Sequence, residues 1–342
     1  MPANTATFQD IAQYTGLSKT TISRYFNKPD TVSPANREKI RRALDVLNYK
    51  ENKVAKILAE GHTEFIGLLI PNLYFSFFAE VLDRFLSTYE NHGYKFLVFI
   101  GDRKADLERQ YLSELQAYHA EGLIVLSHTL PSFELLQFGL PVVTIEREDQ
   151  YVSSVNTDNL SGALQAVRLL QQSKCDVYIH INSSDDDPRT PAYDRLRGFT
   201  SACDAYRLPS EIIRYDSETD YHDLEQKIER ILDQIIETYP GKRKGIFCSS
   251  DSIANIVLNS LLRRFGHFPD DYALVGFDDS LVSQRAVLPI SSVAQQTDLL
   301  VENAMALLQE QIRQKHEGKL PPFEPVHRTV APILRVRETA KP

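Results

Sequence analysis

Hydrogen-bonding and cationic side chains share one face of a short helix predicted near the start of the chain. Ser18 is a suitable N-cap for this helix, and Ile22 and Phe26 follow at i, i+4 spacing, so both face a core. The opposite face carries side chains that donate hydrogen bonds, namely Lys19, Thr20, Ser23, Arg24 and Asn27. Such donors bind phosphates and read base edges, which is typical of a helix that enters the major groove of DNA.

A preceding helix has to hold this face in position. Phe8, Ile11 and Ala12 form its apolar stripe, and a tight turn at Gly16 separates the two helices. A third helix follows, with Ser33 as its N-cap. A glycine turn between two helices also occurs in small helical domains that bind no DNA. We predict base contacts from Lys19, Thr20 and Arg24, and phosphate contacts from Thr7, Ser18, Thr21, Asn27 and Ser33.

The charge of the chain divides between its N-terminal part and the remainder. The whole chain has 38 Lys and Arg residues against 46 Asp and Glu, with a net charge of −8 and a pI near 5.6. Residues 1–62 contain ten of the basic residues and only six of the acidic ones. A basic N-terminal region on an acidic body indicates that DNA binding is confined to that region.

A specific series of residues runs through positions 10–58 in unbroken order. It consists of Asp10-Ile11-Ala12, Gly16-Leu17-Ser18, Thr21-Ile22-Ser23-Arg24, Asn27, Val32-Ser33, Arg37-Glu38-Lys39, Leu47-Asn48-Tyr49, Asn52, Ala55 and Leu58. In this series the chain resembles the lactose/galactose repressor (LacI/GalR) family of bacterial transcription regulators, and the resemblance extends over nearly the whole chain. It implies a helix-turn-helix DNA-binding head at residues 1–50, a hinge helix and linker at 51–62, and an effector-binding and dimerisation core at 63–342.

The hinge segment is too short to hold a helix in water by itself. The resemblance implies that Asn52, Ala55 and Leu58 lie in the minor groove when the hinge folds on DNA, with Leu58 inserted between base pairs. Two positions depart from the family, because Glu51 replaces a usual proline and Lys53 a usual arginine. We therefore expect weaker or more salt-sensitive binding by the hinge.

From residue 65 onward, short apolar segments alternate with amphipathic ones. Strands are predicted at Phe65–Ile70, Lys95–Ile100, Gly122–Leu126, Pro141–Ile145, Val177–Ile181, Gly245–Ser249 and Ala273–Phe277. This alternation predicts parallel, doubly wound α/β sheets in two lobes. The predicted fold class is thus a small all-α helix-turn-helix head plus an α/β core that, by the resemblance, is periplasmic-binding-protein-like. The first lobe is expected at about 63–158 and 290–322, and the second at about 159–289 and 323–342.

Ligands of open α/β sheets bind beyond the carboxyl ends of the strands. Four aromatic side chains follow the first predicted strand within five residues. We predict that Tyr74, Phe75 and Phe77 stack on a ring face of the ligand, whereas Phe78 packs in the lobe.

Polar residues after other strands complete the predicted effector site. The resemblance assigns effector contacts to Glu146, Arg195 and Asp278, whose carboxylate and guanidinium groups offer paired hydrogen bonds to vicinal hydroxyls. Two positions differ from the family, which usually has aspartate in place of Glu146 and an amide in place of Ser250. We include Ser250 among the effector contacts, and we predict that Asp251 caps the helix that begins there.

Several classes of protein do not fit the composition. The chain has neither a run of 18 apolar residues nor a basic-then-apolar leader, which predicts a cytoplasmic, nucleoid-associated protein without a membrane segment. Cys175, Cys203 and Cys248 are widely spaced, so reduced thiols are expected, with no metal and no cofactor. Residues 330–337 are predicted to form a closing strand, and no leucine heptads follow, which favours a homodimer over a coiled-coil tetramer.

The expected function is sequence-specific transcriptional regulation, as the repressor of a carbohydrate-utilisation operon. A homodimer would bind a palindromic operator in double-stranded DNA and would be released by a small sugar effector in the cleft between the lobes. The ligand could instead be a phosphosugar, because Arg147 and Arg195 leave that open, or a nucleobase or a protein coregulator, and it could act as a corepressor. A sugar-processing enzyme is a further alternative, with Glu146 and Asp278 as acid and base, but no nucleophile motif, phosphate loop or metal cluster accompanies them.

Overall fold

The computed structural model describes residues 6–50, 62–147, 150–183, 187–188, 190–215 and 221–342. The chain divides into two compact units, residues 1–62 and 63–342. The predicted hinge contacts Asn52, Ala55 and Leu58 lie outside the described residues. None of the described helices combines the length and the apolar character that crossing a membrane requires.

The N-terminal unit is a small helical domain, as predicted. Its elements are α1 (Phe8–Thr15), α2 (Lys19–Asn27), η1 (Pro29–Thr31) and α3 (Pro34–Val46). Ile11, Ile22 and Ile40 are fully buried between the helices and form the centre of the core. Gly16 ends α1 in the left-handed conformation, at φ 69°, where glycine pays no steric penalty. This turn allows α2 to leave α1 at an angle and keeps one face of α2 outside the core.

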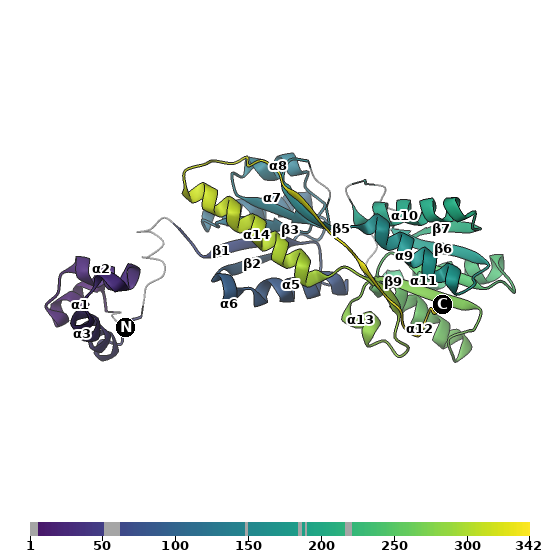
Figure 1. The fold of residues 1–342 in the computed structure, drawn as a ribbon, viewed down its shortest axis with the longest axis horizontal. Coiled ribbons are helices and arrows are strands. Elements are labelled where there is room, and N and C mark those ends of the chain that lie inside the picture. The colour runs from purple at the N-terminus through teal and green to yellow at the C-terminus, as the bar shows by residue number, and fades with distance from the viewer. Residues whose placement is uncertain (1–5, 51–61, 148–149, 184–186, 189, 216–220) are drawn as a thin grey trace. The chain divides into compact units, whose positions relative to one another are not determined.

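The first lobe of the larger unit contains a parallel six-stranded sheet with helices on both faces (Figure 1). Its strands are Phe65–Ile70 (β1), Lys95–Ile100 (β2), Gly122–Val125 (β3), Val142–Ile145 (β4), Ser153–Thr157 (β5) and His327–Val330 (β11), in the order β11-β5-β4-β3-β1-β2. One face is covered by α5 (Ser76–Ser87) and α14 (Thr297–His316), and the other by α7 (Ala105–Ala117) and α8 (Ser132–Gln137). A short helix, α6 (Tyr89–His92), follows α5.

The second lobe repeats this plan with one antiparallel edge strand. Its strands are Val177–Ser183 (β6), Ser210–Tyr215 (β7), Lys244–Cys248 (β8), Tyr272–Asp278 (β9), Ser291–Ala294 (β10) and Ile333–Arg335 (β12), in the order β12-β10-β9-β8-β6-β7. β12 runs antiparallel to β10. One face is covered by α9 (Asn159–Gln172) and α10 (Pro191–Tyr206), and the other by α11 (Tyr221–Thr238) and α12 (Asp251–Phe265). The four-residue helix α13 (Leu281–Gln284) lies after β9.

All seven strands predicted from the apolar segments are present, and the fold class is confirmed. The first passage between the lobes lies where β5 ends and α9 begins, at residues 157–159, as predicted near 156–159. The predicted return near residue 290 is wrong, because β10 pairs with β9 in the second sheet and the chain leaves that lobe only afterwards. Such a short strand is stabilised by its partners across the sheet rather than by its own sequence.

The predicted final passage near residue 322 is wrong as well. β11 pairs with β5 and therefore belongs to the first lobe. The single closing strand predicted at residues 330–337 is divided into β11 and β12, which lie in different sheets. Pro332 separates the two strands, and proline has no N–H group for a sheet ladder. The C-terminal segment thus joins both lobes.

Candidate functional site

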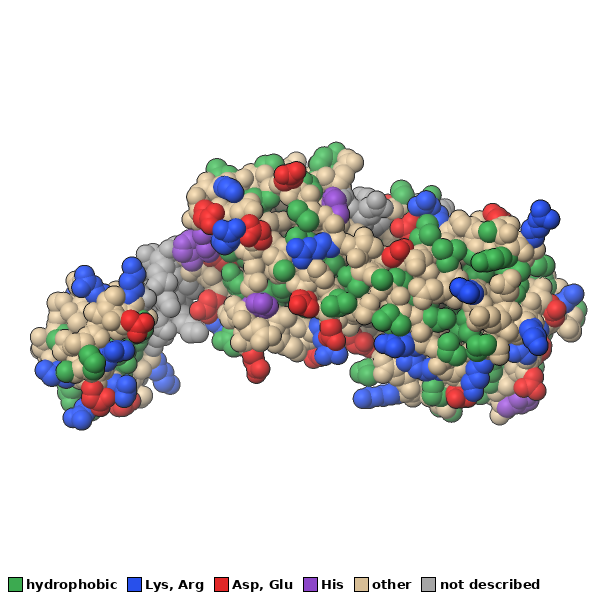
Figure 2. Space-filling view, viewed as in Figure 1, with side chains coloured by type: hydrophobic (Ala, Val, Ile, Leu, Met, Phe, Trp, Pro, Cys, Tyr) green, Lys and Arg blue, Asp and Glu red, His purple; other side chains and the backbone are tan. Residues whose placement is uncertain are grey.

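The outer face of α2 has the exposure that base reading requires. Lys19, Thr20 and Arg24 are all exposed, while Ile22 on the opposite side of the helix is fully buried. Lys19 Nζ donates a hydrogen bond to Gln9 Oε1 at 2.9 Å. Figure 2 shows Lys and Arg side chains on the visible face of this unit. The face exists as predicted, and its contacts with bases remain a prediction.

Three of the predicted phosphate-binding residues are helix N-caps. Ser18 Oγ accepts from the N–H of Thr21 at 3.1 Å, and Ser33 Oγ is the N-cap of α3. Thr7 forms a capping box with Asp10, which the sequence analysis missed although the residues are three apart. These hydroxyls order the first turns of the three helices, whose N-termini attract anions. Phosphate contact by these residues stays a prediction, and the side chain of Asn27 is outside the described part of the chain.

In the larger unit, the structure brings together the three residues predicted to form the centre of the effector site. Arg195 Nη2 lies 3.5 Å from Glu146 Oε2, and Arg195 Nη1 lies 3.8 Å from Asp278 Oδ1. All three side chains are buried. Because Glu146 follows β4 of the first lobe and Arg195 lies on α10 of the second, the ion pair between them joins the two lobes.

Arg195 is held rigidly by its surroundings. Its Nε donates to Asn159 Oδ1 at 2.8 Å, and its Nη1 donates to the carbonyl oxygen of Ser249 at 2.6 Å. The guanidinium lies 3.7 Å from the centroid of the Phe277 ring, within the range of a cation–π contact. The charged group is thus oriented before any ligand arrives, which reduces the entropy lost on binding.

Both acidic residues of the cluster have strained backbones. Glu146 has φ 52° and Asp278 has φ 112°, values that residues with a Cβ rarely adopt. Hydrogen bonds compensate for the strain: Glu146 Oε2 accepts from Asn159 Nδ2 at 2.9 Å, and Asp278 Oδ1 accepts from Gln295 Nε2 at 2.5 Å. The surrounding side chains thus hold both carboxyl groups in fixed positions.

A third carboxyl group lies close to the cluster. Asp251 is fully buried, and its Oδ2 accepts from the N–H of Ser280 at 2.7 Å while its Oδ1 accepts from Ser292 Oγ at 2.6 Å. Burial raises the pKa of Asp251 to about 7. Burial also raises the pKa of Asp278 well above its usual value, with the charge of Asp251 adding to the rise and Arg195 opposing it. The prediction that Asp251 caps α12 is wrong, because Ser250 is the N-cap.

Two residues of the cluster were missed by the sequence analysis. Asn159 binds both Glu146 and Arg195, and Gln295 binds Asp278 while its Oε1 accepts from Thr157 Oγ1 at 2.9 Å. Both lie where the chain passes between the lobes, directly after β5 and β10. A polar residue directly after the last strand before each crossing between the lobes could have identified them. The second crossing was predicted near residue 290, before the end of β10, so Gln295 was not considered.

The aromatic residues after β1 differ in their surroundings. Tyr74 is 60% exposed and remains a candidate for stacking on a ligand. Phe77 packs in the hydrophobic core of the first lobe, in edge contact with the half-buried Phe78. The prediction that Phe77 faces the ligand is therefore corrected, because α5 turns this side chain toward the sheet. Phe75 packs against the core of the second lobe instead.

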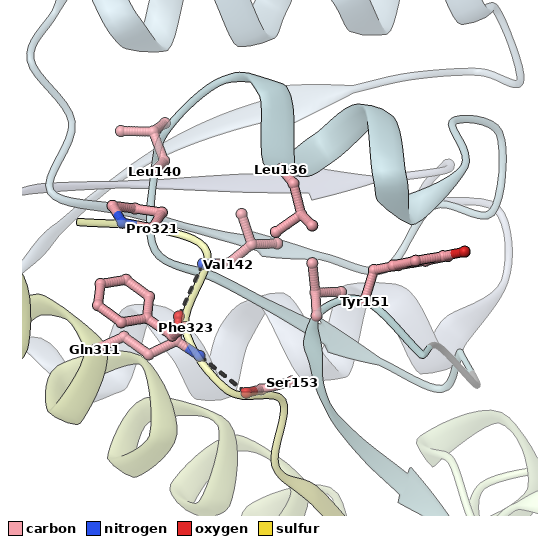
Figure 3. Close-up of a pocket in the computed structure, with 9 residues that line it drawn as sticks. Leu136, Leu140, Val142, Tyr151, Ser153, Gln311, Pro321 and Phe323 are labelled. Atoms are coloured by element: carbon pink, nitrogen blue, oxygen red, sulfur yellow. Dashed lines mark hydrogen bonds between the residues drawn. The ribbon is translucent and has the colours of Figure 1, made fainter. Parts of the chain in front are cut away.

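A separate pocket in the first lobe does not fit a sugar. It lies between the α8–β4 region and the segment at Pro321, and Gln311 forms its polar side by binding the N–H of Val142 at 3.0 Å and Ser153 Oγ at 2.9 Å (Figure 3). Its cavity volume of about 10 Å³ has room for one water molecule at most. Gln311 here has a structural role, joining α14 to β4 and β5.

The close approach of α10 to α9, which brings Arg195 to Asn159, depends on Gly198. A Cβ at Gly198 would lie 2.5 Å from the carbonyl oxygen of Leu160. We expect Gly198→Ala to lower the free energy of unfolding by about 1 to 3 kcal/mol and to weaken ligand binding, because the helices must separate. Urea denaturation monitored by circular dichroism measures this. Ala205→Ser, on the exposed side of the same helix, is the control, and equal stability of the two variants would contradict the packing argument.

Comparisons with known proteins match both the N-terminal unit and the larger unit. Residues 7–52 match the family model "Bacterial regulatory proteins, lacI family", and residues 167–339 match "Periplasmic binding protein-like domain". The ribose operon repressor of Halalkalibacterium halodurans is 30% identical over 339 residues, which cover 98% of this chain and 97% of that protein. The repressor CytR of Escherichia coli K12 is 26% identical over 323 residues, covering 92% of each.

Solved structures share the fold over the full length. The regulator CelR in complex with cellobiose is 26% identical and covers 98% of this chain and 99% of its own, with a TM-score of 0.68. The Lac repressor dimer bound to operator and an anti-inducer has the same coverage, 20% identity and a TM-score of 0.82, which shows a common fold. From the whole-length relative and the family models together, the chain belongs to the LacI family of bacterial regulatory proteins, which are DNA-binding transcriptional repressors and not enzymes.

Proposed function

We propose that this LacI-type regulator represses a carbohydrate-utilisation operon in the cytoplasm, at the nucleoid. A homodimer would bind a palindromic operator through α2 of each protomer, and a sugar bound between the lobes would release it. The observation that carries the proposal is the buried Glu146–Arg195–Asp278 cluster, which joins the two lobes. Its planar donors and acceptors suit vicinal hydroxyl groups, and a ligand bound to Glu146 and Arg195 would contact both lobes and favour the arrangement in which both contacts form.

The charge of the cluster favours an unphosphorylated sugar. The one guanidinium of the cluster is already paired with Glu146 and Asp278, so a phosphate dianion would enter a buried site without a free cation to pair with. Arg147, the other arginine considered for phosphate binding, is 1% exposed and donates from Nη1 to the carbonyl oxygen of Ser127 at 2.9 Å and from Nη2 to that of Leu130 at 2.5 Å. Its side chain therefore fastens the loop after β3.

The relatives point to the same class of ligand. The ribose operon repressor and the CelR–cellobiose complex refer to ribose and cellobiose, and a further relative, 28% identical over 274 residues, is the sucrose operon repressor of Streptococcus mutans. Each of these is an uncharged polyol, in agreement with the acidic cluster. Whether the ligand releases the operator or strengthens its binding is decided by experiment, and we propose release.

The test is a thermal-shift screen of the full-length protein with D-ribose, D-glucose, sucrose, cellobiose, ribose 5-phosphate and glucose 6-phosphate. A ligand at 100 times its dissociation constant adds about 2.7 kcal/mol to stability, which raises the melting temperature by several degrees. The sugar that does so should also release DNA selected from a random pool in a mobility-shift assay. Stronger stabilisation by a phosphorylated sugar than by its parent would contradict the charge argument, and stabilisation without any effect on DNA binding would contradict the proposed switch.

A further inference from the structure

The first lobe also contacts the second outside the Glu146–Arg195–Asp278 cluster. The backbone N–H of Ser76, at the start of α5, donates to Ser252 Oγ on α12 at 3.4 Å. One turn further along α5, Glu80 Oε1 accepts from the backbone N–H of Leu281, at the start of α13, at 2.7 Å. A single helix of the first lobe is thus bonded to two helices of the second.

An aromatic side chain of the first lobe also takes part in this contact between the lobes. Phe75 precedes α5 and packs against the hydrophobic core cluster of the second lobe, which includes buried residues of α11 and α12. The turn that presents it is fixed by Asn72, whose Oδ1 accepts from the N–H of Tyr74 at 3.0 Å and from that of Phe75 at 3.4 Å. An apolar side chain placed on the core of the other lobe gains free energy only while the lobes stay together.

Glu80 is the charged member of this contact. Burial raises its pKa, as does the neighbouring charge of Asp279, whereas the N–H of Leu281 and the charge of Arg84 lower it. Asp279 is itself paired with Arg337, and Arg84 with Asp298. An ionised acceptor makes a stronger hydrogen bond to an N–H group than a neutral one does. The bond from Leu281 to Glu80, at 2.7 Å, is also shorter than the bond from Ser76 to Ser252, at 3.4 Å, so it is the stronger of these two polar links.

We propose that Phe75, Ser76 and Glu80 form an interlobe clasp, and that Glu80 is a positioning residue that sets how tightly the cleft holds its effector. Glu80 acts through the second lobe and not through the ligand. The clasp stabilises the arrangement of the two lobes that the structure has, and the apparent affinity of a ligand scales with the fraction of molecules already in the arrangement that binds it. The statement about effector affinity rests on the proposed function, whereas the clasp itself does not.

The chain contains no tryptophan, so a single introduced tryptophan reports on the clasp. The parent variant for this experiment is the full-length protein with Phe75→Trp. Iodide quenching of its tryptophan fluorescence is measured without ligand, in the parent and in three double variants that add Glu80→Ala, Glu80→Gln or Glu90→Ala. Glu80→Ala should raise the quenching constant by up to about tenfold, because a larger fraction of molecules with parted lobes leaves the tryptophan accessible to iodide. Glu80→Gln keeps an acceptor for Leu281 and should restore quenching to within about twofold of the parent. Glu90→Ala, an exposed carboxylate on α6, is the matched control.

A second measurement, without the tryptophan, compares the apparent affinity of the sugar found in the thermal-shift screen. Glu80→Ala should weaken it about tenfold, and Glu80→Gln should largely restore it. Quenching that is the same in Glu80→Ala as in the parent would overturn the clasp, as would equal effects of Glu80→Ala and Glu90→Ala. If no sugar binds even the unmodified protein, the proposed function fails, while the quenching experiment still decides whether the clasp exists.

Discussion

The Asp278→Asn variant is expected to bind the effector sugar about 100-fold more weakly than the unmodified protein, while its affinity for operator DNA without sugar stays within about twofold. The amide retains the shape of the side chain and tolerates the positive φ of this position better than alanine does. It lacks the second oxygen of the carboxyl group, and a buried polar group left without its hydrogen-bond partner costs about 1 to 3 kcal/mol. Isothermal titration with the sugar and a mobility-shift assay with the operator measure the two affinities.

Asp270→Asn provides the matched control for this experiment. Asp270 is an exposed residue just before β9, so the same chemical change there removes a charge without touching the cluster. The control should bind sugar and DNA as the unmodified protein does. An Asp278→Asn variant that keeps its sugar affinity would show that the cleft assignment is wrong, and loss of operator affinity would show that Asp278 supports the DNA-binding state instead.

The second large effect concerns the recognition face. Arg24→Ala should reduce the affinity for the specific operator by about 10- to 100-fold, because a base contact is worth about 1 to 3 kcal/mol. Affinity for unrelated DNA should fall much less, since a residue that reads bases contributes little to phosphate binding. Fluorescence anisotropy with operator and scrambled duplexes at one fixed salt concentration measures the ratio.

The control variant Arg41→Ala distinguishes the loss of a base contact from the loss of one positive charge in the DNA-binding unit. Arg41 is an exposed arginine on α3 that is paired with Glu38 at 3.0 Å. Its removal subtracts the same charge from the same unit, so we expect a loss of no more than about threefold, equal for both duplexes. A similar loss of discrimination in both variants would mean that Arg24 acts only through its charge.

The local features of the head could be predicted because short-range interactions decide them. Ser18 and Ser33 cap helices within three residues of themselves, and Gly16 ends α1 through its own backbone freedom. The apolar strands of the core were equally predictable, since a buried parallel strand must be almost wholly apolar. The choice of Arg195 and Asp278 came from resemblance to a family, and the structure adds that they lie within 3.8 Å of each other.

Three of the errors share one physical origin. The end of β10, the division between β11 and β12, and the burial of Phe77 are all set by partners far away in the sequence. Phe77 and Phe78 are neighbours of equal hydrophobicity, and only the direction of α5 decides which of them enters the core. The direction of α5 is set by its packing on the sheet, which the neighbouring residues in the sequence do not specify.

By itself, the sequence determined the helices of the head, the exposed donors of α2 and the α/β character of the core, because each depends on residues a few positions apart. Only the tertiary structure decided which side chains meet between the lobes: Glu146 with Arg195, Asn159 with both, and Glu80 with the backbone of Leu281. The partners in these contacts are separated by 13 to 201 positions in the chain. Their meeting results from the packing of two complete sheets and their helices, which no local pattern specifies.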